Sequence, residues 1–423
     1  MHNFAIMTRR IVIFSLIILF LLGIESLIYN ALLPLFSVAK WVEISYYAFQ
    51  FGAVGSLLYV IVKARDRRTQ GIKSPLSNIL MGSMIAFALP KIVLSLFLII
   101  EDITRWIRYG WSSINNQFDS DGTVSSIFPN RMELYIQVIL LIALTFFLLL
   151  IYGILFGKYR YQVRKVVIES DDVPDNFHGY KIVQISDIHS GTFDSVDKVQ
   201  KGIDMINAQG ADLVLFTGDL VNNIATEIEP FIAIFDSIKS KDGKFSILGN
   251  HDYGDYVKWE SPAVKEANLE RLISNQGKMG FKMMRNANER IERNDQFINL
   301  LGVDNWGKPP FPQHGDLEKA TKGITSDAFN ILMSHDPSHW DYQIKEHDKD
   351  INLTLSGHTH GMQLGIDWLG IKWSPVKYRY RKWAGLYTEN DRHLYVNRGF
   401  GFLGWPGRLG IWPEITSIEL KKR

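Results

Sequence analysis

The stretch YKIVQISD, residues 180–187, decides the fold of the C-terminal half of this chain. Its apolar run predicts a buried β-strand, and an Asp-x-His motif, Asp187 and His189, stands at its carboxyl end. Four later stretches also end a predicted strand in Asp, Asn or His: ADLVLFTGD (211–219), GKFSILGN (243–250), FNILMSHD (329–336) and INLTLSGH (351–358). Helical patterns, such as 196–210 and 260–276, lie between them. The alternation predicts a layered α/β domain with a mostly parallel sheet covered by helices.

The polar residues after these strands are of the types that bind metal ions. In an open α/β sheet, ligands gather outside the carboxyl ends of the strands, so we expect the five loops to converge. They carry seven candidate metal ligands: the oxygen donors Asp187, Asp219 and Asn250, and the imidazoles of His189, His335, His358 and His360. Seven side chains are too many for one tetrahedral zinc. They suit two metals about 3.5–4 Å apart with a shared carboxylate, an arrangement that serves phosphoryl displacement.

Two features of the composition limit which residues can form this site. The chain has no cysteine, so the metals must be held by His, Asp, Glu or Asn. Gly218, Gly249 and Gly357 each precede a candidate ligand. Glycine adopts the sharp turns needed there and leaves room beside the metals.

The ordered series D-x-H, GD, GNHD, H and GHTH across residues 187–360 resembles the calcineurin-like metallophosphoesterase superfamily. YVNRGFG (395–401) and PEITSIEL (413–420) further resemble the close of the branch that includes bacterial membrane-tethered members. The resemblance implies a hydrolase with central β-sheets flanked by helices and two divalent metal ions. Mn²⁺, Fe²⁺/Fe³⁺ and Zn²⁺ all fit, and the sequence does not identify the metal.

The resemblance also assigns roles. Metal one would be held by Asp187, His189 and His360, metal two by Asn250, His335 and His358, and Asp219 would bridge them. A hydroxide between the metals is the expected nucleophile. His251 would stabilise developing charge and protonate the leaving oxygen, while Asp252 orients it.

The N-terminal half is predicted to be a membrane region. Four apolar stretches, at about 11–33, 43–62, 78–100 and 134–157, have the length that a spanning helix needs. We therefore expect a four-helix transmembrane region over residues 1–160 and a phosphoesterase domain over 165–423. Glu25 and Lys91 fall inside predicted spans, where charges are usually paired; a contact with a lipid headgroup or substrate is the alternative.

The short loops predict the orientation. One side carries 11 Lys and Arg residues and the other carries 4. Basic loops stay in the cytoplasm, so the chain is predicted to be a multi-pass cell-membrane protein with a cytoplasmic catalytic domain. The motif TRR at 8–10 resembles part of an export signal, but no small-residue cleavage site follows it.

The substrate is left open at this point. One hypothesis is hydrolysis of a phosphomonoester, phosphodiester or pyrophosphate on a lipid-linked substrate at the cytoplasmic leaflet. UDP-2,3-diacylglucosamine hydrolases are the nearest comparison, but their motif has arginine where His251 stands. The alternatives are a phosphodiesterase for soluble nucleotides with the spans as an anchor, or a non-catalytic membrane sensor or scaffold. The net charge of +2 argues against nucleic acid, and no obligate protein partner is evident.

The segment WLGIKWSPVKYRYRKWAGLY (368–387) interleaves basic and aromatic residues. It predicts either a strand pair with aromatics packed inward or a surface that touches the lipid bilayer.

Overall fold

The computed structural model describes residues 20–33, 40, 44–48, 50, 52, 55, 75–115, 131–309, 311–325 and 328–423. They fall into two compact units. The first, the helical unit, holds Ser83–Ile151 and the described residues before Leu58. The second, the phosphoesterase domain, holds Tyr152–Arg423 and the start of helix α3 up to Gly82.

The helical unit is built on α3 (Pro75–Asn115) and α4 (Glu133–Leu155). Within them, Leu80–Trp111 and Glu133–Leu155 are long and apolar enough to cross a membrane, and a shorter apolar helix covers Phe20–Leu32. The helix Phe20–Leu32 lies within the first predicted span, 11–33, whose first residues fall outside the described residues. Most of the second predicted span, 43–62, also falls outside the described residues, although residues 44–48 are helical.

Helix α3 is longer than the apolar run 78–100 that predicted it. It continues through Pro90 and past Ile100 because the charged residues that follow pair with one another. Arg105 contacts Asp102 at 2.8 Å, and Arg131 contacts Glu101 at 2.5 Å and Asp102 at 2.7 Å. Paired charges allow a helix to continue where hydropathy alone would end the span.

The predicted pair of Glu25 and Lys91 forms. The Lys91 ammonium lies 2.7 Å from the Glu25 carboxylate. The Tyr46 hydroxyl also donates to Glu25 at 2.5 Å, and Lys91 donates to Gln50 at 2.5 Å. These charges therefore balance one another inside the helical unit.

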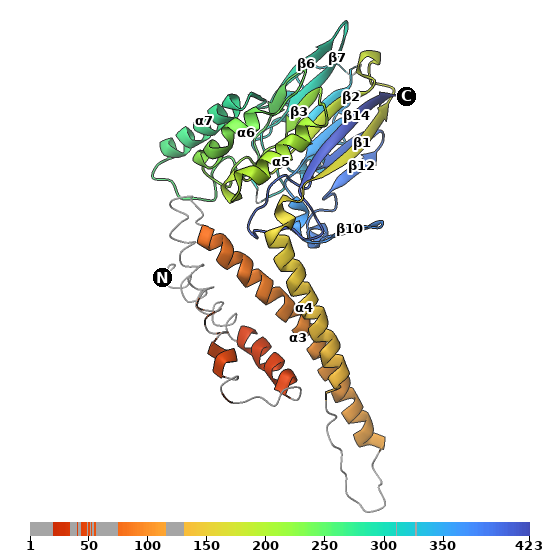
Figure 1. Cartoon of the computed structure of the whole chain (residues 1–423). Helices are drawn as coiled ribbons and strands as arrows, with labels where there is room; N and C mark the ends of the chain where they lie inside the picture. Colours follow the sequence, from red (N-terminus) through yellow and green to blue (C-terminus); the bar gives the residue numbers. More distant parts are fainter. Residues whose placement is uncertain are drawn as a thin grey trace, which may run out of the picture. The chain divides into compact units, whose positions relative to one another are not determined.

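Two six-stranded sheets form the centre of the phosphoesterase domain (Figure 1). The first has the order β1 (Gln162–Ser170), β14 (Glu414–Lys422), β2 (Tyr180–Ile185), β3 (Leu213–Phe216), β4 (Lys244–Ser246), β5 (Phe281–Met283). The second has the order β12 (Gly385–Glu389), β13 (Arg392–Val396), β9 (Leu353–Ser356), β8 (Asn330–Met333), β7 (Gln296–Gly302), β6 (Ala287–Arg293). Both are mostly parallel, with antiparallel pairs β14–β2, β12–β13 and β6–β7. The α/β prediction is confirmed, but the strands form two sheets, whereas the strand pattern indicated one.

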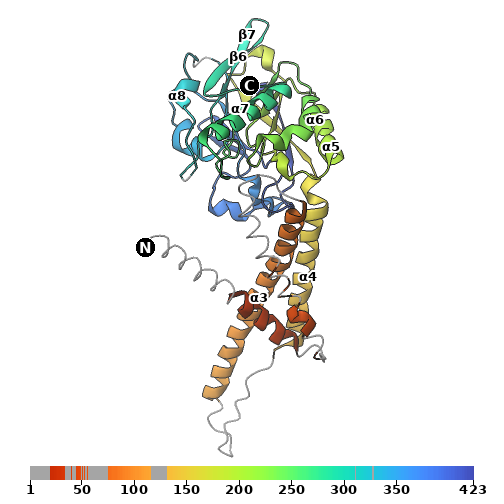
Figure 2. The same cartoon turned by 90° about the vertical axis from the view of Figure 1, so that its left-hand side faces the viewer.

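Helices cover the outer face of each sheet (Figure 2). The first sheet packs against α5 (Val196–Asn207), α6 (Ile232–Asp236) and α7 (Pro262–Lys278), and the second against α8 (Leu317–Ala320) and the short π-helix η6 (Trp340–Ile344). Ile182 of β2 packs into the core between the sheets, and its neighbour Val183 packs into the core beneath α5–α7. This alternation follows the two-residue period of a strand and produces four layers.

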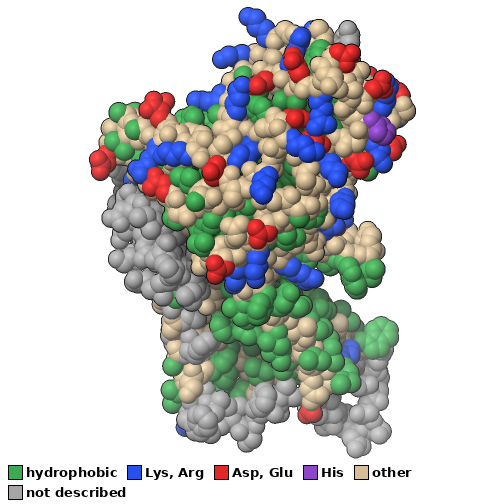
Figure 3. Space-filling model, turned by 45° about the horizontal axis from the view of Figure 1, so that its top comes forward, with side chains coloured by type: hydrophobic (Ala, Val, Ile, Leu, Met, Phe, Trp, Pro, Cys, Tyr) green, Lys and Arg blue, Asp and Glu red, His purple; other side chains and the backbone are tan. Residues whose placement is uncertain are grey.

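The surfaces of the two units differ in composition (Figure 3). The helical unit is largely hydrophobic, with exposed residues such as Leu134, Leu141 and Leu148. The phosphoesterase domain carries interspersed basic and acidic side chains. Each surface suits its solvent, lipid for the first and water for the second.

Candidate metal centre

The predicted ligands all lie in loops that follow strands of the two sheets. Asp187 and His189 follow β2, Asp219 follows β3, and the 250–252 segment follows β4, all in the first sheet. His335 follows β8, and the 358–360 segment follows β9, in the second sheet. The carboxyl ends of strands from both sheets therefore meet at one edge of the layered core.

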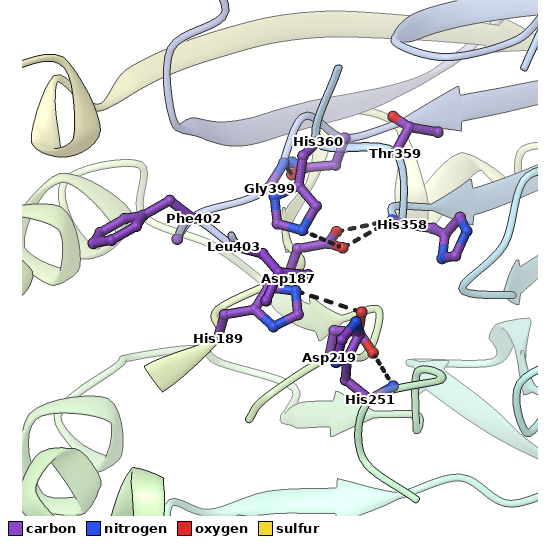
Figure 4. A network of polar contacts seen from close by, with 12 residues as sticks. Asp187, His189, Asp219, His251, His358, Thr359, His360, Gly399, Phe402 and Leu403 are labelled. Atoms are coloured by element: carbon purple, nitrogen blue, oxygen red, sulfur yellow. Dashed lines mark hydrogen bonds and ion pairs between the residues drawn. The ribbon is translucent and has the colours of Figure 1, made fainter. Parts of the chain in front are cut away.

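The first group of ligands is Asp187, His189 and His360, all buried, with one ligand atom from each within 4.8 Å of the others. Nε2 of His360 lies 3.3 Å from Oδ1 of Asp187, and the rings of His189 and His360 are 4.9 Å apart (Figure 4). This is the set predicted for metal one.

The second group is Asp219, His335 and His358, again with ligand atoms within 4.8 Å of one another. Oδ2 of Asp219 lies 3.2 Å from Nε2 of His335 and 3.5 Å from Nε2 of His189, so one carboxylate reaches both groups. Oδ1 of Asn250 lies 2.8 Å from Nδ1 of His358. The geometry thus places Asn250 with the second group and Asp219 between the two.

The donor atoms fit divalent cations. Nε2 of His335 and Nε2 of His360 are buried and have no hydrogen-bond partner among the described residues, although each faces a carboxylate oxygen. Buried polar atoms are rarely left without a partner. A cation between nitrogen and oxygen donors would satisfy both, so the residues present fit two metals.

The electrostatics favour the same conclusion. Burial lowers the pKa of His358 and, to a greater degree, that of His360, which keeps both imidazoles neutral as ligands must be. Burial also favours neutral His335, but the carboxylates of Asp219 and Asp187 outweigh it and raise its pKa to about 10. The raised pKa shows that the carboxylates of Asp219 and Asp187 favour positive charge at this position.

Five of the ligands adopt a backbone conformation that side-chain-bearing residues rarely take. Their φ angles are positive: Asp187 53°, His189 47°, Asp219 62°, His358 72° and His360 50°. Each such residue costs about 1–3 kcal/mol and persists only where the surroundings enforce it. Strain shared by most of a ligand set is typical of a functional site.

The three predicted glycines do leave room for the ligands. A Cβ on Gly249 would collide with the carboxylate of Asp219, and one on Gly357 with the carboxylate of Asp187. Gly218 has φ +94°, and a Cβ there would lie 2.5 Å from the backbone nitrogen of Gly249.

His251 lies next to the shared Asp219, with its ring 4.9 Å from that of His189, but Asp252 has a different set of contacts from the one expected. Its two carboxylate oxygens accept hydrogen bonds from the backbone N–H groups of Asp219, Leu220, Val221 and Gly249. Nδ1 of His251 lies 2.8 Å from the carbonyl oxygen of Asn222. Asp252 therefore joins the β3 and β4 loops, and the Asn222 carbonyl orients the His251 ring.

Comparison with known proteins identifies the family of this chain. Residues 9–158 match the family described as "Probable Calcineurin-like phosphoesterase, transmembrane domain", and residues 180–362 match the family "Calcineurin-like phosphoesterase". The uncharacterized metallophosphoesterase YkuE of Bacillus subtilis (strain 168) is 32% identical over 63% of this chain and 90% of its own length. The chain belongs to the calcineurin-like metallophosphoesterases.

Other relatives share parts of the chain. A transmembrane protein with metallophosphoesterase domain from Danio rerio is 31% identical over 65% of this chain. This chain spans 60% of that protein's length. The crystal structure of the phosphopantetheinyl hydrolase of Mycobacterium tuberculosis has 10% identity over 52% of this chain and 89% of its own, with a TM-score of 0.32. The match of residues 9–158 to the transmembrane-domain family confirms that the N-terminal region is associated with the membrane. The bounds of its four predicted spans and of the two domains stay predictions.

Sequence reasoning missed Arg408 of this metallophosphoesterase. Its guanidinium is fully buried and donates to the carbonyls of Gly399 and Gly401, while Nη2 lies 3.2 Å from Nδ1 of His360. Burial lowers the pKa of Arg408 to about 9. Its backbone N–H donates to the carbonyl of Gly153 in α4 at 3.2 Å. One residue thus contacts both a metal ligand and the last turn of a membrane helix.

Tyr380 and Asp336 were also not assigned to the site. The Tyr380 hydroxyl lies 2.8 Å from Nε2 of His358, and Oδ2 of Asp336 lies 3.5 Å from the same nitrogen. Groups that hold the second nitrogen of a ligating histidine fix its tautomer and ring orientation. Asp336 also accepts from the Ser338 N–H at 2.8 Å, so its carboxylate caps the turn that follows it. No local motif marks Tyr380, since it reaches His358 from a segment 22 residues later.

Proposed function

We propose that this metallophosphoesterase hydrolyses a phosphoester or pyrophosphate bond with two divalent metals, on a lipid-linked substrate at the cytoplasmic leaflet. The observation that carries the hydrolytic part is the pair of buried ligand groups that share Asp219. When bound, two cations would activate water for in-line attack on phosphorus and neutralise the phosphate charge.

In the proposed reaction, water forms a new P–O bond as the bond to the leaving oxygen breaks. His251 is placed to supply the proton that the leaving oxygen needs. Its ring packs against that of Tyr256, tilted by 34° with centroids 4.5 Å apart, and its backbone N–H donates to Oδ1 of Asp219 at 2.8 Å. Because the Asn222 carbonyl can only accept, Nδ1 carries a hydrogen, and in the proposal the imidazolium form of His251 gives its Nε2 proton to the leaving oxygen, while the attacking water releases its own proton to solvent.

Asp252 stabilises the position of His251 relative to Asp219. By accepting four backbone N–H groups, it fixes the loop of the shared carboxylate against the loop that carries His251. Its role in the proposal is to hold these two loops in register, so that proton donor and ligand keep their relative positions.

The connection between membrane helix and catalytic domain supports a substrate at the bilayer. Helix α4 ends at Leu155 and β1 begins at Gln162, with only the 3₁₀ turn η2 (Gly157–Tyr159) between. Lys158 in that turn is buried and pairs with Asp194. A short, packed connection holds the domain close to the membrane surface, whereas a soluble nucleotide substrate would require no such closeness.

A substrate panel tests the proposal. The full-length protein in nanodiscs of phosphatidylcholine and phosphatidylglycerol, supplied with Mn²⁺, would be offered lipid pyrophosphates, nucleotides and bis(p-nitrophenyl) phosphate. We expect metal-dependent hydrolysis, fastest for lipid-linked substrates in the same bilayer. Preference for nucleotides would favour the soluble-substrate alternative. Absence of turnover on every substrate at full metal loading would favour the non-catalytic sensor.

The orientation needs a separate test. A reporter fused after Arg423 is expected to behave as cytoplasmic, because the basic loops lie on the side of the catalytic domain. A periplasmic signal at that position would overturn the cytoplasmic assignment.

A further inference from the structure

Strands β10 (Ile366–Trp368) and β11 (Ile371–Trp373) form an antiparallel hairpin with one apolar and one charged face. Ile366 pairs with Trp373 and Trp368 with Ile371, while Asp367 pairs with Lys372. Directly opposed residues of an antiparallel pair share a face, and successive residues alternate between faces.

The charged face of this hairpin is the one turned toward the protein. The Asp367 carboxylate lies 2.9 Å from Arg164 and 2.9 Å from Arg398, and its side chain is only 16% exposed. Lys372 donates to the carbonyl of Ala384. These contacts fix the hairpin with its polar residues inward, the reverse of the usual arrangement at a water-exposed surface.

The apolar face and the turn are therefore exposed. Relative exposures are 47% for Ile366, 73% for Trp368, 76% for Leu369 and 59% for Ile371. Single exposed apolar residues are ordinary on soluble surfaces, but a contiguous group on a protruding hairpin marks an interaction site.

The hairpin begins beside the end of α4. The N–H of Gly365, just before β10, donates to the carbonyl of Leu409 at 3.0 Å. Arg408, which precedes Leu409 in the chain, donates its N–H to the carbonyl of Gly153 in α4. Helix α4 has 23 residues, a length of about 34 Å, which matches the hydrocarbon core of a bilayer. Exposed Phe156 follows it, as aromatic residues commonly do at a membrane surface.

We propose that the β10–β11 hairpin inserts its apolar face into the interfacial region of the lipid bilayer, on the side where α4 ends. Lipid is the expected partner of the apolar face because the hairpin lies beside the end of α4, where the chain leaves the membrane. The segment that follows the hairpin, its basic flank, also suits an anionic lipid surface, because its residues Lys377, Arg379 and Arg381 are exposed. Basic residues near an anionic leaflet are attracted to it.

Only the first part of the segment 368–387 belongs to the strand pair that was one of its two predicted structures. Pro375–Tyr378 form a 3₁₀ turn, η8, and Trp383 is buried. Tyr380 turns inward to His358, so the segment that follows the hairpin contributes to the wall of the metal centre. The proposed membrane contact therefore brings one wall of the metal centre close to the lipid headgroups.

Because the chain has no cysteine, one introduced thiol can report on the hairpin of the full-length protein. Leu369→Cys would carry a nitroxide spin label in phosphatidylcholine–phosphatidylglycerol vesicles. Accessibility to oxygen, which concentrates in lipid, would be compared with accessibility to a water-soluble nickel chelate. The control is Asp295→Cys in the exposed β6–β7 turn, which lies at the opposite end of the phosphoesterase domain from β10 (Figure 1).

We expect the label at 369 to favour oxygen strongly and the label at 295 to favour the nickel chelate. Equal accessibility of both labels to the chelate would overturn the proposal. A label at 369 shielded from both reagents would overturn it too, because it would point to a protein partner such as a second copy of this chain. These readouts are independent of catalysis, so they stand or fall separately from the proposed hydrolysis.

A second comparison tests the basic flank. Lys377→Gln, Arg379→Gln and Arg381→Gln together remove three exposed charges. In the parent protein, the label at 369 is expected to lie deeper in phosphatidylglycerol-containing vesicles than in pure phosphatidylcholine, and in the triple variant this difference should disappear. An unchanged difference in the triple variant would overturn the role of these residues in lipid contact.

Discussion

The helical unit and the phosphoesterase domain both bury charged side chains, and they balance these charges in different ways. In the helical unit, Lys91 meets Glu25 at 2.7 Å, so the charges neutralise each other directly. In the phosphoesterase domain, Nε2 of His335 and Nε2 of His360 face the carboxylates of Asp219 and Asp187, and neither nitrogen has a hydrogen-bond partner among the described residues. The first arrangement is complete as protein alone, whereas the second is complete only when cations enter it.

The largest expected effect is that of Asp219→Asn. An amide replaces the carboxylate that reaches both ligand groups, so we expect a loss of more than about 10⁴-fold in turnover together with lower metal content. Metal per protein would be measured by elemental analysis beside the rate.

Asp212→Asn is the matched control for that variant. Asp212 is buried at the opposite end of β3 from Asp219 and pairs with Lys241 and Arg293. It should lose stability yet keep metal and turnover. Equal metal loss in both variants would show that any buried carboxylate of the sheet supports the centre, which would contradict the bridging role.

His251→Ala is expected to have the next largest effect. A general acid typically contributes about 10²–10⁴-fold to rate, so turnover should fall by that factor while both metals stay bound. Substrates with a good leaving group, such as p-nitrophenolate, should be less affected because they need no proton. Metal loss as severe as in Asp219→Asn would mean that His251 supports the centre structurally.

Arg408→Lys should weaken the first metal moderately. Lysine keeps a charge but loses the fork that holds the Gly399 and Gly401 carbonyls and Nδ1 of His360. Partners of a ligating histidine contribute about 10–100-fold in metal affinity. Excess Mn²⁺ should restore activity, which it would not do for a variant that is merely misfolded.

The matched control is Arg392→Lys, another arginine held by several backbone carbonyls, in this case of Ile344, Lys345 and His347. Its metal affinity should equal that of the parent protein. If both arginine variants needed the same excess of Mn²⁺, the effect would come from general loosening of the domain.

The smallest effect is expected in the helical unit. A double-mutant cycle with Glu25→Gln and Lys91→Gln should give a coupling free energy of about 1 kcal/mol, measured by unfolding in detergent, with metal content unchanged. If either single variant lost hydrolysis of lipid-linked substrates at full metal loading, the pair would serve substrate contact and the contrast between the units would fail.

Much of the metal centre could be predicted because its ligands follow strands directly. A strand that ends in Asp-x-His or Gly-Asn-His fixes both the residue type and the place of the ligand. Asp187, Asp219 and His335 needed no knowledge of long-range packing beyond the convergence of strand ends. The apolar stretches of α3 and α4 were predictable for a similar reason, since bilayer thickness sets the length of a spanning run, although α3 itself extends beyond that run.

The roles of Asp252, Tyr380 and Arg408 could not be predicted from local patterns. Whether the Asp252 carboxylate meets a side chain or four backbone N–H groups depends on how the β3 and β4 loops lie against each other. Tyr380 and Arg408 reach the ligands from segments 22 and 48 residues away. Such contacts carry no periodicity or motif.

The sequence by itself determined which residues are candidate metal ligands, the order of strands and helices and the membrane character of the N-terminal half. These properties follow from short-range patterns of hydropathy and chemistry. Only the tertiary structure decided that two sheets share the centre and that β14, from the end of the chain, lies between β1 and β2. It also decided that the hairpin at 366–373 turns its charges inward and its apolar side chains outward. Alternation along a strand separates two faces but does not say which one is covered, because that depends on where Arg164 and Arg398 are brought by the rest of the fold.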